Sequence, residues 1–177
     1  MSIRSVFVLL AAVLLLLSSA LAQGAPTTQL CVAAVQVGGL QINDPSFSTT
    51  AVQNAFIKDF AKQKNSRLET VTLKASAPDD ALAEAKEKKC EYVVTTNVAE
   101  IHSESGYTGG LAGVNMQNFF VTVNYKLNKV ADGAEQASGS VKASDRSGAQ
   151  TATIETMKKI SEKVAGALKN AGSAPAS

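Results

Sequence analysis

The chain has few of the residues from which catalytic and metal sites are built. It contains one histidine, two cysteines and no tryptophan among its 177 residues. The single His102 excludes a multi-histidine metal site, and Cys31 and Cys90 lack the C-x-x-C spacing and the further ligands of a zinc site. The motifs G-x-G-x-x-G, G-x-x-x-x-G-K-[ST] and G-x-S-x-G are also missing. We therefore expect no metal, no cofactor and no catalytic residues.

The chain also lacks an excess of charge of either sign. Seventeen lysines and arginines face fifteen aspartates and glutamates. Nucleic-acid binding depends on a concentrated basic surface, so this balance argues against a nucleic-acid partner. The charges are interspersed along the predicted helices and indicate solvated faces, with a basic membrane-binding or partner-binding face as the alternative.

No apolar run reaches the roughly 20 residues that span a bilayer. The longest run, residues 6–17, follows Arg4 and precedes Ala20-Leu21-Ala22, an order typical of a signal peptide. We expect cleavage after Ala22 and a periplasmic or secreted mature protein without stable membrane insertion. A retained membrane anchor is the alternative.

The rest of the chain is predicted to form one domain. Residues 23–29 are polar and without period, residues 30–170 carry the periodic segments, and residues 171–177 are small and expected to be disordered. No internal repeat is present.

The hydrophobic periods change along this domain. Strand and helix patterns alternate up to residue 98, as in consecutive βαβ units, and a period of two follows from Phe119. Thr50 and Gln53 have the spacing of a capping box, and Asp132-Gly133 predicts a turn. The pattern indicates an α/β (α+β) fold, a mixed five-stranded sheet packed against three helices in the order β-α-β-α-β-β-β-α. The predicted elements are strands at 30–37, 67–74, 92–98, 119–127 and 137–143, and helices at 49–63, 78–89 and 147–168.

Both cysteines stand at the start of a predicted strand. In a right-handed parallel arrangement the first and third strands are neighbours, so Cys31 and Cys90 can come within the Cα separation that a disulfide needs. An even cysteine count in an exported protein favours the same bond. Two buried free thiols are the alternative.

The glycine-rich segment 103–113 is the predicted working surface. Long loops without their own structure are often binding elements, and Tyr107, Gly109 and Gly110 lie in this one beside His102. A disordered excursion between two strands is the alternative interpretation. A small-ligand-binding protein or hydrolase that uses His102 and this loop is the second functional hypothesis.

The order of elements resembles a group of bacterial envelope domains that includes the amino-terminal domain of TolB, LpoB and CsgG. The resemblance rests on the strand at 30–35, the helix Ala83-Glu84-Ala85-Lys86, the segment Cys90-Glu91-Tyr92-Val93-Val94-Thr95-Thr96-Asn97-Val98 and the Asp132-Gly133 turn. It implies a non-enzymatic module that recognises another envelope protein. Unlike LpoB and CsgG, this chain has no lipid-attachment cysteine at the predicted cleavage site.

Overall fold

The computed structural model describes residues 27–38, 47–63, 67–108 and 114–172. The predicted signal peptide, its cleavage site after Ala22, Gly109 and Gly110 and the last five residues of the predicted tail lie outside these ranges. Within them the fold is a mixed sheet with three helices, as the sequence predicts. The elements in chain order are β1 (Thr28–Val32), β2 (Gln36–Val37), α2 (Thr49–Lys62), β3 (Leu68–Thr72), α3 (Pro78–Glu87), β4 (Tyr92–Thr108), β5 (Val114–Lys129), β6 (Glu135–Asp145) and α4 (Ala149–Gly172).

The sheet has six strands rather than the predicted five. Its order is β3-β1-β4-β5-β6, with β2 paired to β4. β1 is parallel to both β3 and β4, whereas β4, β5 and β6 are antiparallel to one another. The sixth strand arises because the predicted strand 30–37 is divided in two. β1 pairs with both β3 and β4, whereas β2 pairs with β4. Between them, Ala33 N donates to Val94 O and Ala34 N donates to Ala75 O.

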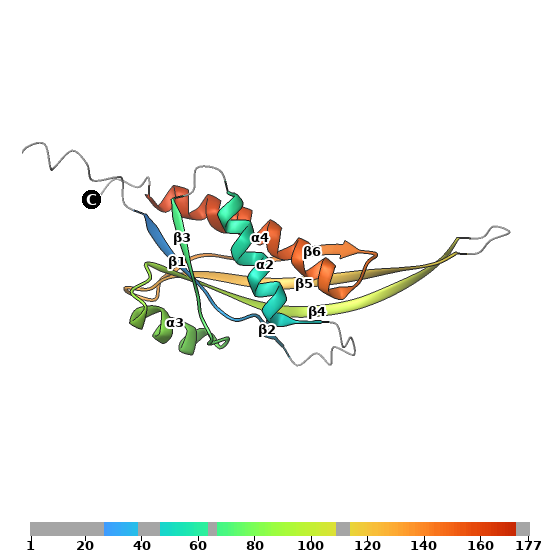
Figure 1. Cartoon of the computed structure of the whole chain (residues 1–177), viewed down its shortest axis with the longest axis horizontal. Coiled ribbons are helices and arrows are strands. Elements are labelled where there is room, and N and C mark those ends of the chain that lie inside the picture. Colours follow the sequence, from blue (N-terminus) through green and yellow to red (C-terminus); the bar gives the residue numbers. More distant parts are fainter. Residues whose placement is uncertain (1–26, 39–46, 64–66, 109–113, 173–177) are drawn as a thin grey trace, which may run out of the picture.

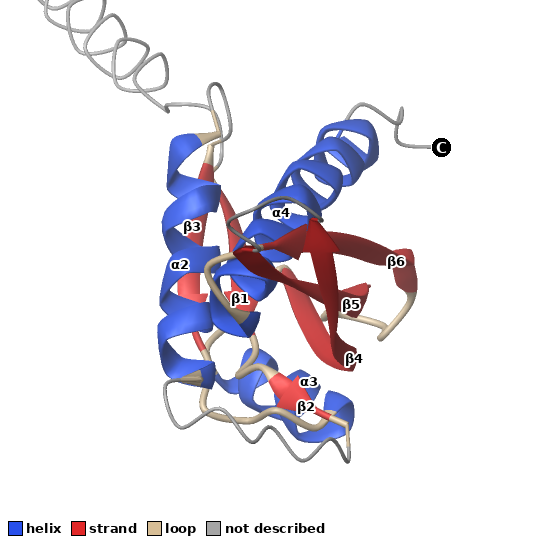
Figure 2. Ribbon diagram, turned by 90° about the vertical axis from the view of Figure 1, so that its right-hand side faces the viewer, coloured by secondary structure: helices blue, strands red, loops and turns tan. Residues whose placement is uncertain are grey.

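Two hydrophobic clusters lie on opposite faces of this sheet. Helices α2 and α4 cover one face, and the shorter α3 covers the end of the other face, as Figures 1 and 2 show. Successive strand residues point to opposite faces, so Val94 packs in the larger cluster with α2 and α4 while its neighbour Val93 packs in the smaller one with α3. The larger cluster includes Phe56 and Phe60 of α2, whose rings lie 4.8 Å apart.

The N-cap of helix α2 lies two residues before Thr50, the N-cap of the predicted capping box. Ser48 is the N-cap, and its hydroxyl accepts a hydrogen bond from Ala51 N at 3.2 Å. Gln53 instead is buried, and its side-chain amide donates to Val32 O at 3.2 Å and to Leu73 O at 3.0 Å. Gln53 therefore bridges the chain ends that leave β1 and β3.

A carboxylate secures the connection between β3 and α3. Glu84 accepts hydrogen bonds from Ala75 N and Lys74 N, each at 2.9 Å, and lies 3.1 Å from Lys88 Nζ. Donation by Ala75 N, together with Lys88 and Lys74, lowers the pKa of the Glu84 carboxyl against the opposing effect of its burial. The ionised form of Glu84 therefore stabilises the fold.

The β5–β6 connection is the predicted Asp132-Gly133 turn. Gly133 has a φ of +72°, which a residue without Cβ adopts most readily, and its N–H donates to Lys129 O at 2.9 Å. Further along β6, the ring of Tyr125 lies over Gly139, where an added Cβ would stand only 3.1 Å from Tyr125 Cε1. Gly139 thus leaves the space in which this buried ring packs.

None of the helices within the described ranges combines the length and the apolar character needed to cross a membrane.

Candidate functional site

The most distinctive feature of the molecule is a two-stranded hairpin that projects from the sheet. β4 and β5 remain paired as far as Thr108 and Val114, but β6 pairs with β5 only up to Phe119, and β2 pairs with β4 only up to Val98. Figure 1 shows the far part of this hairpin extending well away from the helices. We call its described residues, 104–108 and 114–118, the arm.

The arm corrects the prediction of a flexible loop over residues 103–113. Residues 103–108 belong to β4, and Gly106 and Tyr107 pair with Met116 and Asn115. Glycine and serine residues by themselves do not favour a strand. Here the backbone pairing with β5 outweighs that local preference. Gly109 and Gly110 lie outside the described residues, so their predicted role in binding stays a prediction.

His102 lies at the base of the arm, where it pairs with Phe120 of β5. The two rings are stacked, with centroids 5.1 Å apart and planes 12° from parallel. Glu100 Oε1 lies 3.3 Å from His102 Nδ1, and Glu104 Oε1 lies 3.7 Å from its Nε2. Glu100 is itself held by Thr122, whose hydroxyl donates to its other oxygen at 3.1 Å. The arrangement places the imidazole ring between two carboxylates on a half-exposed surface.

The same geometry separates His102 from the serines beside it in sequence. Ser103 and Ser105 alternate with His102 and Glu104 along β4, so they point to the opposite face of the sheet. They do not form the Ser-His-acid arrangement of the hydrolase hypothesis. Among the described residues, no group of three or more histidine, cysteine or acidic side chains is arranged to hold a metal ion.

The predicted pairing of the two cysteines is confirmed. Cys31 and Cys90 form a disulfide, with their Cα atoms 5.8 Å apart. β1 pairs with β4 so that Leu30 lies opposite Tyr92, which brings the two strand starts into the expected register. Both cysteines are buried in the smaller cluster beneath α3.

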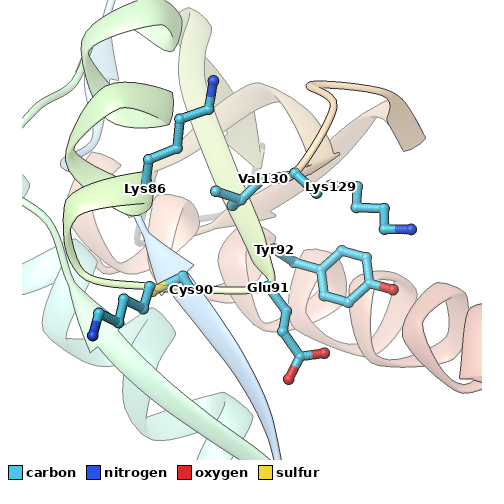
Figure 3. A pocket seen from close by; sticks show the side chains of 8 residues that line it. Lys86, Cys90, Glu91, Tyr92, Lys129 and Val130 are labelled. Atoms are coloured by element: carbon cyan, nitrogen blue, oxygen red, sulfur yellow. The ribbon is translucent and has the colours of Figure 1, made fainter.

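A hollow of about 370 Å³ lies next to this disulfide, between the end of α3 and the β5–β6 turn. Its rim carries Lys86, Lys89 and Lys129, a set that could in principle attract an anion. Figure 3 shows the side chains of Lys86 and Lys129 extending away from each other, and the Glu91 carboxylate lies on the same rim. The cations therefore do not converge on one ligand position.

Comparison with known proteins assigns a fold and no family. No family model matches the sequence, and no curated protein matches it. A hypothetical protein from Chlamydia trachomatis has a similar structure, with a TM-score of 0.60 and 12% identity over 81% of this chain and 98% of that one. A Neisseria meningitidis lipoprotein reaches 0.47 at 11% identity, covering 81% of this chain and 99% of that one. TolB from Acinetobacter baumannii reaches 0.43 at 12% identity, covering 84% of this chain and 29% of that one.

Only the first of these likenesses exceeds a TM-score of 0.5, and at 12% identity it establishes a shared fold alone. The role of the site must therefore be argued from its own geometry. The sequence analysis predicted His102 to lie beside the binding loop, but it did not predict that residues 103–108 and 114–118 form a paired hairpin. The signal that was available is a second, short alternation of apolar and polar residues, Val114-Asn115-Met116-Gln117, which precedes Phe119 and is out of phase with the alternation that begins there.

Proposed function

We propose that this protein is an exported, non-catalytic module of the bacterial envelope that binds another envelope protein through the arm. The observation that carries the proposal is the projection of two paired strands beyond the rest of the sheet. An isolated two-stranded hairpin is marginally stable in water, and unpaired strand edges invite pairing with another chain. A partner that covers or extends the arm accounts for its length.

Strand addition is the binding mode that such an element favours. In the described part of the chain, neither edge of the arm is paired with a third strand. An extended segment of a partner can add to such an edge, with main-chain hydrogen bonds supplying affinity and alternate side chains supplying specificity. The alternating residues at the base of the arm include Glu100, His102 and Glu104, which lie on one face of β4.

The predicted signal peptide indicates export to the envelope, and the resemblance to the TolB, LpoB and CsgG group agrees with this location. Export explains the presence of a disulfide, which persists in oxidising compartments such as the periplasm. The lack of a serine partner for His102 among its sequence neighbours supports a binding role over the hydrolase alternative.

The proposal is tested by shortening the arm. Replacing residues 104–118 with Asn-Gly joins Ser103 to Phe119, which lie directly opposite each other, through a two-residue turn suited to a hairpin. A photoreactive amino acid at exposed Gln117 should crosslink to an envelope protein in cells, whereas the same group at exposed Glu162 of α4 should not. The shortened chain should lose this partner and keep the helical contribution to its far-UV circular dichroism, because all three helices lie outside the deleted residues.

Two outcomes would contradict the proposal. One is capture of the same partner by the full and the shortened chain, and the other is equal crosslinking from Gln117 and Glu162. The His102→Ala variant separates the hydrolase alternative, because binding through main-chain hydrogen bonds of the arm should be weakened at most and not lost. A hydrolase should lose its activity by orders of magnitude in that variant.

A further inference from the structure

The arm and its base have two open strand edges of unequal length. Among the described residues, β4 has no strand beside it beyond its pairing with β2 at Val98, so its edge is open from residue 99 to Thr108. β5 is paired with β6 up to Phe119, so its edge is open only over residues 114–118. Arg146 Nε also donates to Asn118 Oδ1 at 3.3 Å, so the chain that leaves β6 lies beside this shorter edge. The β4 edge therefore offers more room for an added strand.

Charged side chains of opposite sign lie on opposite sides of this surface. Glu100 and Glu104 lie on β4, where residues 99–108 contain no lysine or arginine. Their side chains are 51% and 69% exposed. The nearby cations are Lys142 of β6 and Arg146 just after it, and β5 lies between them and the two glutamates. A cationic segment is therefore attracted to the β4 edge rather than to the β6 side.

The imidazole ring of His102 presents a flat surface at the same edge. His102 pairs directly with Phe120, and the two rings stack with their planes 12° from parallel. One face of the imidazole is thus turned toward β5, and the other face is turned toward the open edge of β4. Glu100 lies at its Nδ1 and Glu104 at its Nε2. A planar cation on the outer face would contact the ring and lie close to both carboxylates.

These features fit an arginine better than a lysine. A guanidinium group is planar, stacks on aromatic rings and binds a carboxylate through two parallel hydrogen bonds. In an added strand, the residue opposite His102 has Glu100 and Glu104 as diagonal neighbours, which a long side chain can reach. The adjacent residue of that strand would lie opposite Ile101, which packs against the larger hydrophobic cluster, so an apolar side chain suits that position.

We propose that the open edge of β4 binds an extended segment of the partner protein that carries an arginine opposite His102 and an apolar residue opposite Ile101. The guanidinium stacks on the imidazole and pairs with the carboxylate of Glu104. This inference rests on the function proposed for the arm, and it specifies the edge that is used and the chemistry of the bound segment.

Photo-crosslinking from two paired positions tests the choice of edge. Ser105 of β4 and Gln117 of β5 lie directly opposite each other and are both exposed. A photoreactive amino acid at Ser105 should give the higher yield of crosslinked partner, because Gln117 lies one strand further from the proposed segment. Mass spectrometry of the crosslinked peptide should find an arginine within about four residues of the attachment site, since strand residues pair one to one.

Binding of the crosslinked segment, synthesised as a peptide, tests the chemistry at this edge. In calorimetric titrations, Glu104→Gln should weaken binding about two- to fivefold and Glu104→Lys at least about tenfold. His102→Ala should weaken it about two- to fivefold, whereas His102→Phe keeps a ring for stacking and should stay within about twofold of wild type. The matched control Glu162→Lys, at an exposed glutamate of α4, should leave the affinity unchanged.

Four results would overturn this inference. They are a higher crosslinking yield from Gln117 than from Ser105, a crosslinked segment without arginine, unchanged affinity in Glu104→Lys, and a second copy of this chain as the crosslinked partner. If a separate envelope protein crosslinks to the arm and any of the first three results is found, the function proposed for the arm stands and this inference fails. If neither position crosslinks and the shortened chain keeps its partner, both fail.

Discussion

Opening the Cys31–Cys90 disulfide should destabilise the fold without changing its topology. The bond joins residues 59 positions apart, and both cysteines are buried against α3 and the start of β4. Reduction leaves two small apolar thiols in the same positions, and β1 remains hydrogen-bonded to β4. The expected loss therefore comes chiefly from the greater freedom of the unfolded chain.

The size of that loss follows from the length of the closed loop. For a separation of 59 residues the chain-entropy model gives about 4 kcal/mol as the upper value. For a protein of this size each kcal/mol corresponds to about 2–4 °C in Tm, so reduction should lower Tm by up to about 16 °C.

Thermal unfolding followed by circular dichroism, with and without dithiothreitol, measures this effect. The double variant Cys31→Ala/Cys90→Ala is the control, because the chain has no other cysteine and its Tm should not respond to the reductant. Oxidised and reduced wild type melting within about 2 °C of each other would refute the reasoning. So would alkylation of two thiols in native protein before any reduction.

Three further substitutions test the contacts that shape the body. Gln53→Leu should cost about 1–3 kcal/mol, because two buried carbonyls each lose a donor. Glu84→Gln should cost about 1–3 kcal/mol near neutral pH, because hydrogen bonds to a charged acceptor and an ion pair are weakened. Gly139→Val should cost about 1–3 kcal/mol by displacing the Tyr125 ring, whereas Ser140→Val on the same strand should be nearly neutral. Urea unfolding at constant m-value measures each change.

Each of these expectations has a result that contradicts it. Gln53→Leu with wild-type stability would mean that the two carbonyls do not need the Gln53 donor, as Val32 O also accepts from Leu73 N at 2.9 Å. For Glu84 the test is its pH dependence. Because folding lowers the pKa of Glu84, its ionised carboxylate stabilises the fold fully above the unfolded pKa of about 4.5. This stabilisation is lost as the pH falls through the pKa of the folded state. The difference between wild type and Glu84→Gln should therefore shrink below about pH 4.5, and a constant difference would exclude the ionised carboxylate as its cause. Equal losses in Gly139→Val and Ser140→Val would show a general effect of valine on β6.

Much of the body follows from local pattern. Val52, Phe56 and Phe60 recur at helical spacing and are buried on α2, and the alternation from Phe119 to Leu127 matches β5. The disulfide could also be predicted from the sequence, because the handedness of βαβ units makes the first and third strands neighbours. In these cases the residues that determine the structure lie close together in the chain or obey a fold-level rule.

The remaining features depend on contacts that local pattern does not contain. The break between β1 and β2 falls in an unbroken apolar run, because it depends on strand pairing: β1 pairs with both β3 and β4, whereas β2 pairs with β4. Gln53 has the spacing of a capping-box residue. In the folded protein its side chain instead donates hydrogen bonds to Val32 O and Leu73 O, where the chain leaves β1 and β3. The alignment of Gln36, Asn97 and Asn124 across the sheet requires the register of three strands from distant parts of the chain, which no single segment specifies.

β4 consists of a half that belongs to the hydrophobic core and a half that leads into the arm. Among the described residues, the buried side chains of β4 end at Val98 and those of β5 begin at Val121. A register shift between Val98 and Glu100 marks the same boundary, and such bulges commonly re-aim a strand. The body therefore closes its hydrophobic core without the arm. Closing the core does not require two strands to extend beyond it, and this supports the proposal that the arm binds a partner.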